Sequence, residues 1–159
     1  MHMKLAPLRN RENELALLER AWKSAKRGRP QLVVLWGRRR VGKTFLLSHF
    51  LQGKRGVLFG ATQQAESVEL GRLHEAVRRD LGDRVADLSG GTYESWEKAL
   101  RFFAVQAEKQ VLVVALDEVP YLSRSTPAFP SIVQNVWDHM PHGTKLVLIL
   151  TGSAVSTVE

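Results

Sequence analysis

Cysteine is absent from the 159 residues of the chain, so neither disulfide bonds nor thiolate metal sites stabilise it. No apolar run approaches the roughly 18 residues of a membrane-spanning helix, and the first residues lack the apolar segment of a secretion signal. These absences argue against a disulfide-stabilised or membrane-spanning fold. We therefore expect a cytoplasmic protein with no membrane partner.

The composition is typical of a soluble globular protein. Apolar residues make up 44% of the chain, and 159 residues are enough to bury a sizeable core. There are no internal repeats and no low-complexity segment. We expect residues 1–159 to form one domain.

A phosphate-binding pattern, G-x-x-x-x-G-K-[ST], lies between an apolar run at residues 32–36 and a helix-like segment at residues 45–51. Its residues are Gly37, Arg38, Arg39, Arg40, Val41, Gly42, Lys43 and Thr44. Glycines at both ends allow backbone N–H groups to wrap closely around phosphate oxygens. The pattern predicts a nucleotide-triphosphate site, for which a basic surface turn is the alternative interpretation.

The residue types in this pattern suit a nucleotide with its metal ion. Lys43 would bring a positive charge to the β and γ phosphates, and the Thr44 hydroxyl would coordinate Mg²⁺. The helix that begins near Phe45 would direct the positive end of its dipole at the same anion. We assign the whole loop and Phe45 to binding of ATP with Mg²⁺, although the three loop arginines are expected to face mainly the solvent.

Apolar patterns predict strands that alternate with helices. Strands are expected at residues 32–36, 56–60, 111–116 and 145–150, and helices at residues 11–26, 45–51, 66–81, 92–107 and 128–140. Residues 82–91 and 118–127 are expected as loops. Continuous apolar strands are typical of a parallel sheet that is covered on both faces. We therefore expect a three-layer α/β/α P-loop fold with a mainly parallel sheet of four strands.

The strand at residues 111–116 leads directly into two carboxylates, Asp117 and Glu118. Acids at the carboxyl end of a central strand lie where open α/β sheets bind ligands. Asp117 would hold Mg²⁺, directly or through water. Glu118 would polarise the attacking water and is, with Lys43, the expected catalytic residue. An ordinary pair of acids at a strand end is the alternative.

The last predicted strand runs into Thr151, Gly152 and Ser153. A hydroxyl at this strand end would sense the γ-phosphate or align the attacking water, and Thr151 and Ser153 are both candidates. Ser153 is assigned to nucleotide binding. A plain Thr-Gly-Ser turn is the alternative interpretation.

Positive charge is concentrated in the first part of the chain, whose net formal charge is +7. Residues 1–60 carry fourteen Lys or Arg against three Asp or Glu, a balance of +11, and residues 61–159 carry nine against thirteen, a balance of −4. Such an excess favours an anionic partner, either a nucleotide or a nucleic acid. A phosphate loop together with a solvated first helix accounts for much of it as well.

In four segments the chain resembles archaeal and bacterial AAA+-like ATPases related to the signal-transduction (STAND) class. These segments are residues 10–15, the phosphate loop, residues 116–122 and residues 148–153, so the resemblance covers nearly the whole chain. Such relatives carry an Arg-Glu motif near the nucleotide base. The resemblance implies that Asn10, Arg11 and Glu12 border the adenine, and capping of the first helix explains these residues equally well.

Two departures from these relatives concern catalysis and the sheet. No arginine lies between Ser125 and Glu159, so the arginine finger that the resemblance implies near the fourth strand is missing. Because such an arginine is worth about 10³–10⁵ in rate, we expect slow hydrolysis. The superfamily's fifth strand and lid domain have no counterpart, which predicts the N-terminal part of a longer ATPase. Residues 32–36 would then form an open edge strand that invites self-association.

The leading hypothesis is a Mg²⁺-dependent ATPase core that binds ATP and ADP and drives a conformational switch. A second hypothesis is a nucleic-acid-binding module, with DNA as a candidate partner and the nucleotide site as its regulator. A small-molecule phosphotransferase is the third, but the adjacent acids Asp117 and Glu118 favour water as the acceptor.

Overall fold

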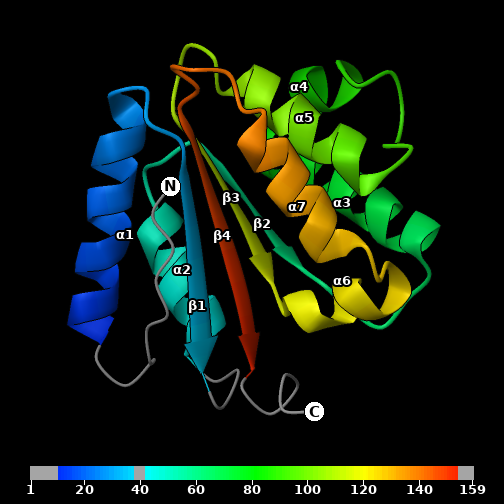
Figure 1. Ribbon diagram of the computed structural model, residues 1–159, viewed down its shortest axis with the longest axis horizontal. Helices are drawn as coiled ribbons and strands as arrows, with labels where there is room; N and C mark the ends of the chain where they lie inside the picture. Colours follow the sequence, from blue (N-terminus) through cyan, green and yellow to red (C-terminus); the bar gives the residue numbers. More distant parts are fainter. Residues whose placement is uncertain (1–10, 38–41, 154–159) are drawn as a thin grey trace.

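The centre of the molecule is a four-stranded sheet (Figure 1). The computed structural model describes residues 11–37 and 42–153. The strands are β1 (Gln31–Gly37), β2 (Gly56–Gly60), β3 (Leu112–Asp117) and β4 (Leu146–Ser153). All pair in parallel, in the order β1-β4-β3-β2. The expected parallel sheet of four strands is confirmed, and so is the position of β1 at an edge.

Helices cover both faces of this sheet and make the three expected layers. They are α1 (Arg11–Lys26), α2 (Lys43–Leu51), α3 (Glu66–Leu81), α4 (Asp83–Asp87), α5 (Trp96–Gln106), α6 (Val119–Ser125) and α7 (Phe129–Asp138). Figure 1 shows α1 and α2 on one face and α3, α5 and α7 on the other. Among the described residues, none of the helices combines the length and the apolar character that a membrane span requires.

Two hydrophobic cores lie on the two sides of the sheet, because successive side chains of a strand point to opposite faces. In β3, Val113 and Ala115 pack in the core beneath α1 and α2. Leu112 and Val114 contribute to the larger core beneath α3, α5 and α7. Every residue of β3 is buried, so this strand holds its carboxyl end in a fixed position.

Three expectations about local structure were wrong. The segments expected as loops contain the short helices α4 and α6, which at five and seven residues are too short to show a helical period. Helix α5 begins at Trp96 rather than at residue 92 or 93, because the Ser95 hydroxyl caps it by accepting a hydrogen bond from the Lys98 N–H at 3.1 Å.

The Thr-Gly-Ser segment is extended strand rather than a turn. Thr151, Gly152 and Ser153 continue β4 and pair in register with the last three residues of β1. A Cβ atom at Gly152 would overlap the ring of its register partner, Trp36. A glycine is therefore needed where the two strands lie side by side, next to the phosphate loop.

The two edges of the sheet differ. At β2, both backbone groups of Leu58 are occupied by side chains of α3: its N–H donates to Asp80 at 2.9 Å, and its carbonyl accepts from Arg79 at 2.6 Å. Charged side chains of this kind protect an edge strand from pairing with another chain. No strand of the described residues pairs with the outer side of β1.

Candidate nucleotide-binding site

The phosphate-binding pattern joins the end of β1 at Gly37 to the start of α2 at Lys43. Its arginines and Val41, at residues 38–41, lie outside the described residues, as do Asn10 and the side chain of Arg11. Gly42 precedes the helix with a φ of 93°, in the left-handed region that only glycine adopts readily. The second glycine of the pattern is thus required by the backbone.

Lys43 is the first residue of α2, and its side chain is completely buried. Its ammonium nitrogen lies 3.6 Å from a carboxylate oxygen of Glu118, which is also buried. The two residues expected to be catalytic therefore lie together, although 75 positions separate them in the sequence.

Asp117 lies at the centre of the site. One of its carboxylate oxygens accepts a hydrogen bond from the Thr44 hydroxyl at 2.8 Å, and the other accepts one from the Thr151 hydroxyl. The Thr151 oxygen in turn accepts from the Glu118 N–H at 3.3 Å. Residues from α2, β3 and β4 thus meet at the carboxyl end of the sheet.

Glu118 has an unusual backbone conformation. Its φ of 61° makes it the only non-glycine residue with positive φ in the described part of the chain. A residue held in this region stores on the order of 1 kcal/mol of strain, and such residues cluster at functional sites. The conformation turns the chain sharply from β3 into α6.

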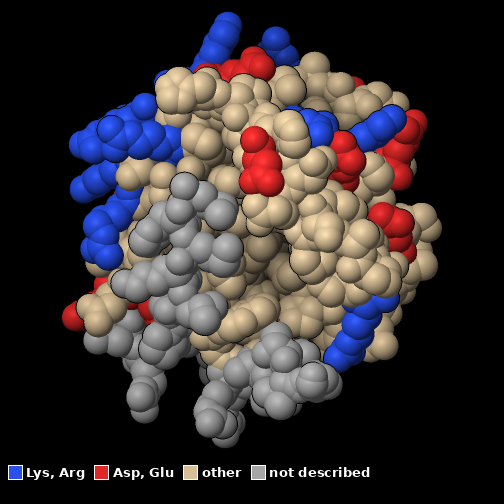
Figure 2. Space-filling view, viewed as in Figure 1, with Lys and Arg blue, Asp and Glu red and all other residues tan. Residues whose placement is uncertain are grey.

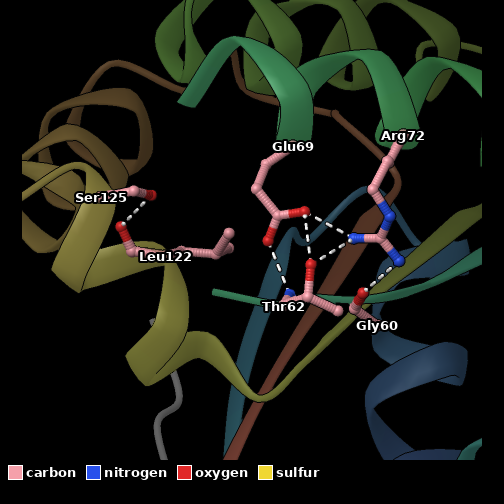
Figure 3. Close-up of polar contacts among 6 residues, drawn as sticks. All are labelled: Gly60, Thr62, Glu69, Arg72, Leu122 and Ser125. Carbon is pink, nitrogen blue, oxygen red and sulfur yellow. Dashed lines mark hydrogen bonds and ion pairs between the residues drawn. The ribbon is translucent and has the colours of Figure 1, made fainter. Parts of the chain in front are cut away.

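A buried carboxylate on the far side of Asp117 fixes the neighbouring loop (Figure 3). Asp117 pairs in register with Gly60, and its carbonyl accepts from the Ala61 N–H at 2.9 Å. Glu69, whose side chain is fully buried, accepts from the Thr62 N–H at 2.6 Å and from Arg72. This network could not be predicted from the sequence, because no local pattern relates α3 to the end of β2.

An arginine that was not predicted from the sequence also borders the site. Arg79 of α3 lines an open hollow of about 430 Å³ together with Thr44 and Asp117. Hydrogen bonds to Asp80 raise the pKa of Arg79. Burial acts to raise the pKa of Asp80, but its hydrogen bonds from Arg79 and from the Leu58 N–H outweigh burial and lower it.

Two other expected nucleotide contacts lie at the border of this cluster. Phe45 is 60% exposed and stacks on His49, one helical turn further along, with ring centroids 6.2 Å apart. Ser153 is half-buried at the end of β4, in register with Gly37. The structure thus brings together Lys43, Thr44, Asp117, Glu118 and Thr151, and leaves Phe45 and Ser153 beside them.

The oxygen atoms around Asp117 suit a magnesium ion. Mg²⁺ prefers oxygen ligands and is held by one or two protein groups together with substrate phosphates. A hydroxyl and a carboxylate only 2.8 Å apart provide such a pair. No cluster of three or more His, Cys, Asp or Glu that would hold a metal by itself occurs among residues 11–37 and 42–153, so the donor set does not resemble an all-protein metal cage.

A parallel α/β/α sheet with a phosphate-binding pattern after β1 and an acid at the end of β3 defines the class of P-loop ATPases. Within this class, the chain belongs to a family described as an ATPase domain predominantly from Archaea, whose model matches residues 8–159.

Two proteins of Methanocaldococcus jannaschii are similar in sequence. An uncharacterised ATP-binding protein is 50% identical over 46 residues, which are 29% of this chain and 73% of that protein. An uncharacterised protein is 27% identical over 126 residues, 79% of this chain and 26% of that protein. The chain therefore spans about a quarter of the longer relative.

Solved structures confirm the fold. A Walker-type ATPase of Pyrococcus abyssi superposes with a TM-score of 0.59 at 24% identity, over 91% of this chain and 45% of that one. The ORC2 protein of Aeropyrum pernix, solved as ADPNP-ADP complexes, gives 0.62 at 18%, over 94% and 42%. Drosophila ORC bound to DNA gives 0.66 at 18%, over 91% and 38%. The chain spans less than half of each.

Proposed function

We propose that this chain is a Mg²⁺-dependent ATPase core, in which ATP binding and hydrolysis switch the conformation of a longer protein. The observation that carries the proposal is the hydrogen bond of 2.8 Å between Thr44 and Asp117. It joins the end of the phosphate loop to the end of β3, so a metal-bound phosphate would meet both oxygens at once.

Each residue of the cluster has a role that follows from its chemistry. Lys43 carries the positive charge for the β and γ phosphates, and Thr44 and Asp117 supply oxygen ligands to Mg²⁺. When bound, the ion would neutralise charge that develops on the phosphates. Glu118 accepts a proton from the attacking water, and Thr151 holds Asp117 through its hydroxyl.

A change of partner by Lys43 would couple nucleotide binding to this switch. Its ammonium group lies 3.6 Å from a carboxylate oxygen of Glu118. Phosphate oxygens would compete for the same ammonium group, since charge-assisted hydrogen bonds to phosphate are strong. Glu118 would then be available to the water, and its strained backbone is where a change in α6 would begin. A role like that of STAND ATPases is consistent with this exchange.

Slow turnover is part of the proposal. The part of the chain after Arg124 has no arginine, and Arg79, which lines the hollow beside Asp117, is already bonded to Asp80 and to the Leu58 carbonyl. An arginine finger supplied by another subunit or domain would then raise the rate, by about 10³–10⁵.

The test is a titration of ATP with and without Mg²⁺, combined with a turnover assay on the wild type and on Glu118→Gln. We expect the variant to bind Mg²⁺–ATP like the wild type, because the amide keeps the shape of the side chain. Its turnover should fall by about 10²–10⁴-fold, the usual contribution of a general base.

The matched control is Glu108→Gln, which changes an exposed glutamate away from the site and should leave both readouts unchanged. Turnover that persists in Glu118→Gln would refute the role of this residue. Binding of ATP with equal affinity in the presence and absence of Mg²⁺ would refute the metal site.

A further inference from the structure

Five basic residues form a surface at the end of α1 and in the turn that follows it. They are Arg20, Lys23, Lys26, Arg27 and Arg29, and all five are exposed; we call them the α1 basic patch. In Figure 2, basic side chains crowd the upper left of the molecule, over the end of α1 that Figure 1 places there. The structure thus gathers part of the positive charge of residues 1–60 into one surface.

The basic residues of the patch form no ion pair with any described residue, in contrast to those of α3 and α5. Basic residues bonded to a carboxylate elsewhere are Arg72, Arg78, Arg79, Lys98 and Arg101. The acid nearest in sequence to the patch, Glu19, lies 2.9 Å from Lys54. Charge on the patch is therefore not neutralised by neighbouring side chains.

Helix stability explains only part of this arrangement. Lys23 and Lys26 lie in the last turn of α1, where cations favour the negative end of the helix dipole, and Lys26 also lies over the Trp22 ring at 5.2 Å. Arg20 lies one turn earlier, and Arg27 and Arg29 follow the helix. Helix stability therefore does not account for these three arginines.

The patch borders a groove at the end of the sheet opposite the nucleotide site. The groove has a volume of about 950 Å³ and is lined by Arg20 and Arg29 on the α1 side and by Trp137 and His142 on the α7 side. Its acid, Asp138, accepts a hydrogen bond from Gln134 at 2.8 Å. β1 leads from this end to the phosphate loop over seven residues, roughly 23 Å.

We propose that the α1 basic patch binds the phosphate backbone of a nucleic acid, independently of the nucleotide site. From Arg20 to Lys26 the patch extends along α1 by roughly 9 Å at 1.5 Å per residue, and Arg27 and Arg29 follow in the turn. One strand of duplex DNA has a phosphate about every 3.4 Å along its axis, so the helical part of the patch would span about three phosphates and the arginines of the turn would add about one more. Contacts of this kind bind without reading sequence.

An anionic membrane is the competing partner, and the structure favours it less. A helix that binds a membrane surface buries its apolar side among the lipids. The apolar side of α1, with Leu17, Leu18 and Ala21, is buried in the protein core instead. The exposed large apolar side chains among the described residues are Phe45, Val68, Leu88 and Val105, and none lies in the patch.

The experiment measures binding of a short labelled DNA duplex of mixed sequence over a range of salt concentrations. About four contacts predict that affinity falls on the order of 10²-fold between about 50 and 200 mM salt. The variant with Arg20, Lys23, Arg27 and Arg29 all changed to Gln should bind at least about 10-fold more weakly at low salt, with a nearly flat salt dependence. Its affinity for ATP should be unchanged.

The matched control changes four exposed basic residues outside the patch to Gln, namely Arg84 of α4, Lys98 and Arg101 of α5, and Lys109 after α5. It has the same net charge as the patch variant and should bind the duplex like the wild type. Equal losses in both variants would mean that only total charge matters, and would refute the proposal. Loss confined to a variant with Arg38, Arg39 and Arg40 changed to Gln would place the duplex at the phosphate loop instead, and also refute it.

Two further arms identify the partner. Single-stranded RNA of the same length, used as a competitor, distinguishes RNA from duplex DNA as the preferred source of phosphates. Vesicles that contain phosphatidylserine test the membrane alternative: binding to vesicles with no binding to either nucleic acid would overturn the proposal.

Discussion

Charged side chains at the two ends of the parallel sheet differ in burial and in the partners that they contact. At the carboxyl ends of the strands, Lys43, Asp117 and Glu118 are buried and lie against one another or against hydroxyl groups. At the amino ends, the α1 basic patch is exposed and forms no ion pair with the described residues. The charged groups at the carboxyl ends therefore have fixed positions, whereas those of the α1 basic patch are not held in place by ion pairs.

This difference follows from the cost of removing charge from water. A buried charge must be held by partners, because an unpaired one costs several kcal/mol. Its position is therefore well defined, as recognition of a phosphate and a metal requires. An exposed charge needs no partner, is screened by salt, and adapts to a flexible polyanion. The effects of substitutions at the two ends should therefore differ in size.

The largest effect is expected for Lys43→Ala, which removes the buried charge closest to Glu118. ATP affinity should fall by about 10²-fold or more, because charge-assisted hydrogen bonds to phosphate are lost. Isothermal titration with Mg²⁺–ATP measures the change. Lys109→Ala, which removes an exposed lysine, is the control and should bind ATP normally. A Lys43→Ala protein that is folded and binds ATP as tightly as the wild type would refute the assignment of the site.

A smaller effect is expected for Thr151→Val, which keeps the side-chain shape but removes the hydroxyl between Asp117 and Glu118. The loss of a buried hydrogen bond to a carboxylate is worth about 1.5–3 kcal/mol. We expect turnover to fall about 10-fold and to require more Mg²⁺, and Thr151→Ser to restore both.

The control for this substitution comes from the other end of the same strand. Thr144 precedes β4, is buried, and donates to the Pro141 carbonyl at 2.7 Å. Thr144→Val should lower stability without changing the Mg²⁺ dependence of turnover. If both variants gave the same Mg²⁺ dependence, Thr151 would be structural only.

The smallest effect is expected for Asp80→Asn, whose partner Arg79 is largely exposed. The pKa of Asp80 is lowered in the folded protein, so its carboxylate stabilises the fold above the unfolded pKa, and this contribution is lost as the pH falls through the folded pKa. At neutral pH the variant should be less stable by at most about 1 kcal/mol. Urea unfolding at neutral pH and near pH 3 measures this difference, which should shrink in acid; a difference that grows in acid would contradict the sign.

Much of the fold could be predicted from local patterns. The bounds of β2 and α3 match the expected residues, because glycines flank the one and a regular apolar stripe marks the other. Helices α4 and α6 could not be predicted, since they are too short to show a period. A turn at residues 151–153 was the alternative interpretation, because the segment contains glycine, yet pairing with β1 makes it strand.

The sequence by itself determined which residues are candidates for the proposed nucleotide site. A glycine-bounded loop with Lys43 and Thr44, and two acids after a buried strand, predict phosphate and metal chemistry through residue type and local spacing alone. Only the tertiary structure decided which of them meet. The pairing order of the strands places β4 between β1 and β3, and this brings Thr151 against Asp117. The same packing carries the end of α1 to the opposite end of the sheet, because α1 and β1 run in opposite directions (Figure 1). Contacts of this kind depend on distances across the sheet, which no local sequence pattern contains.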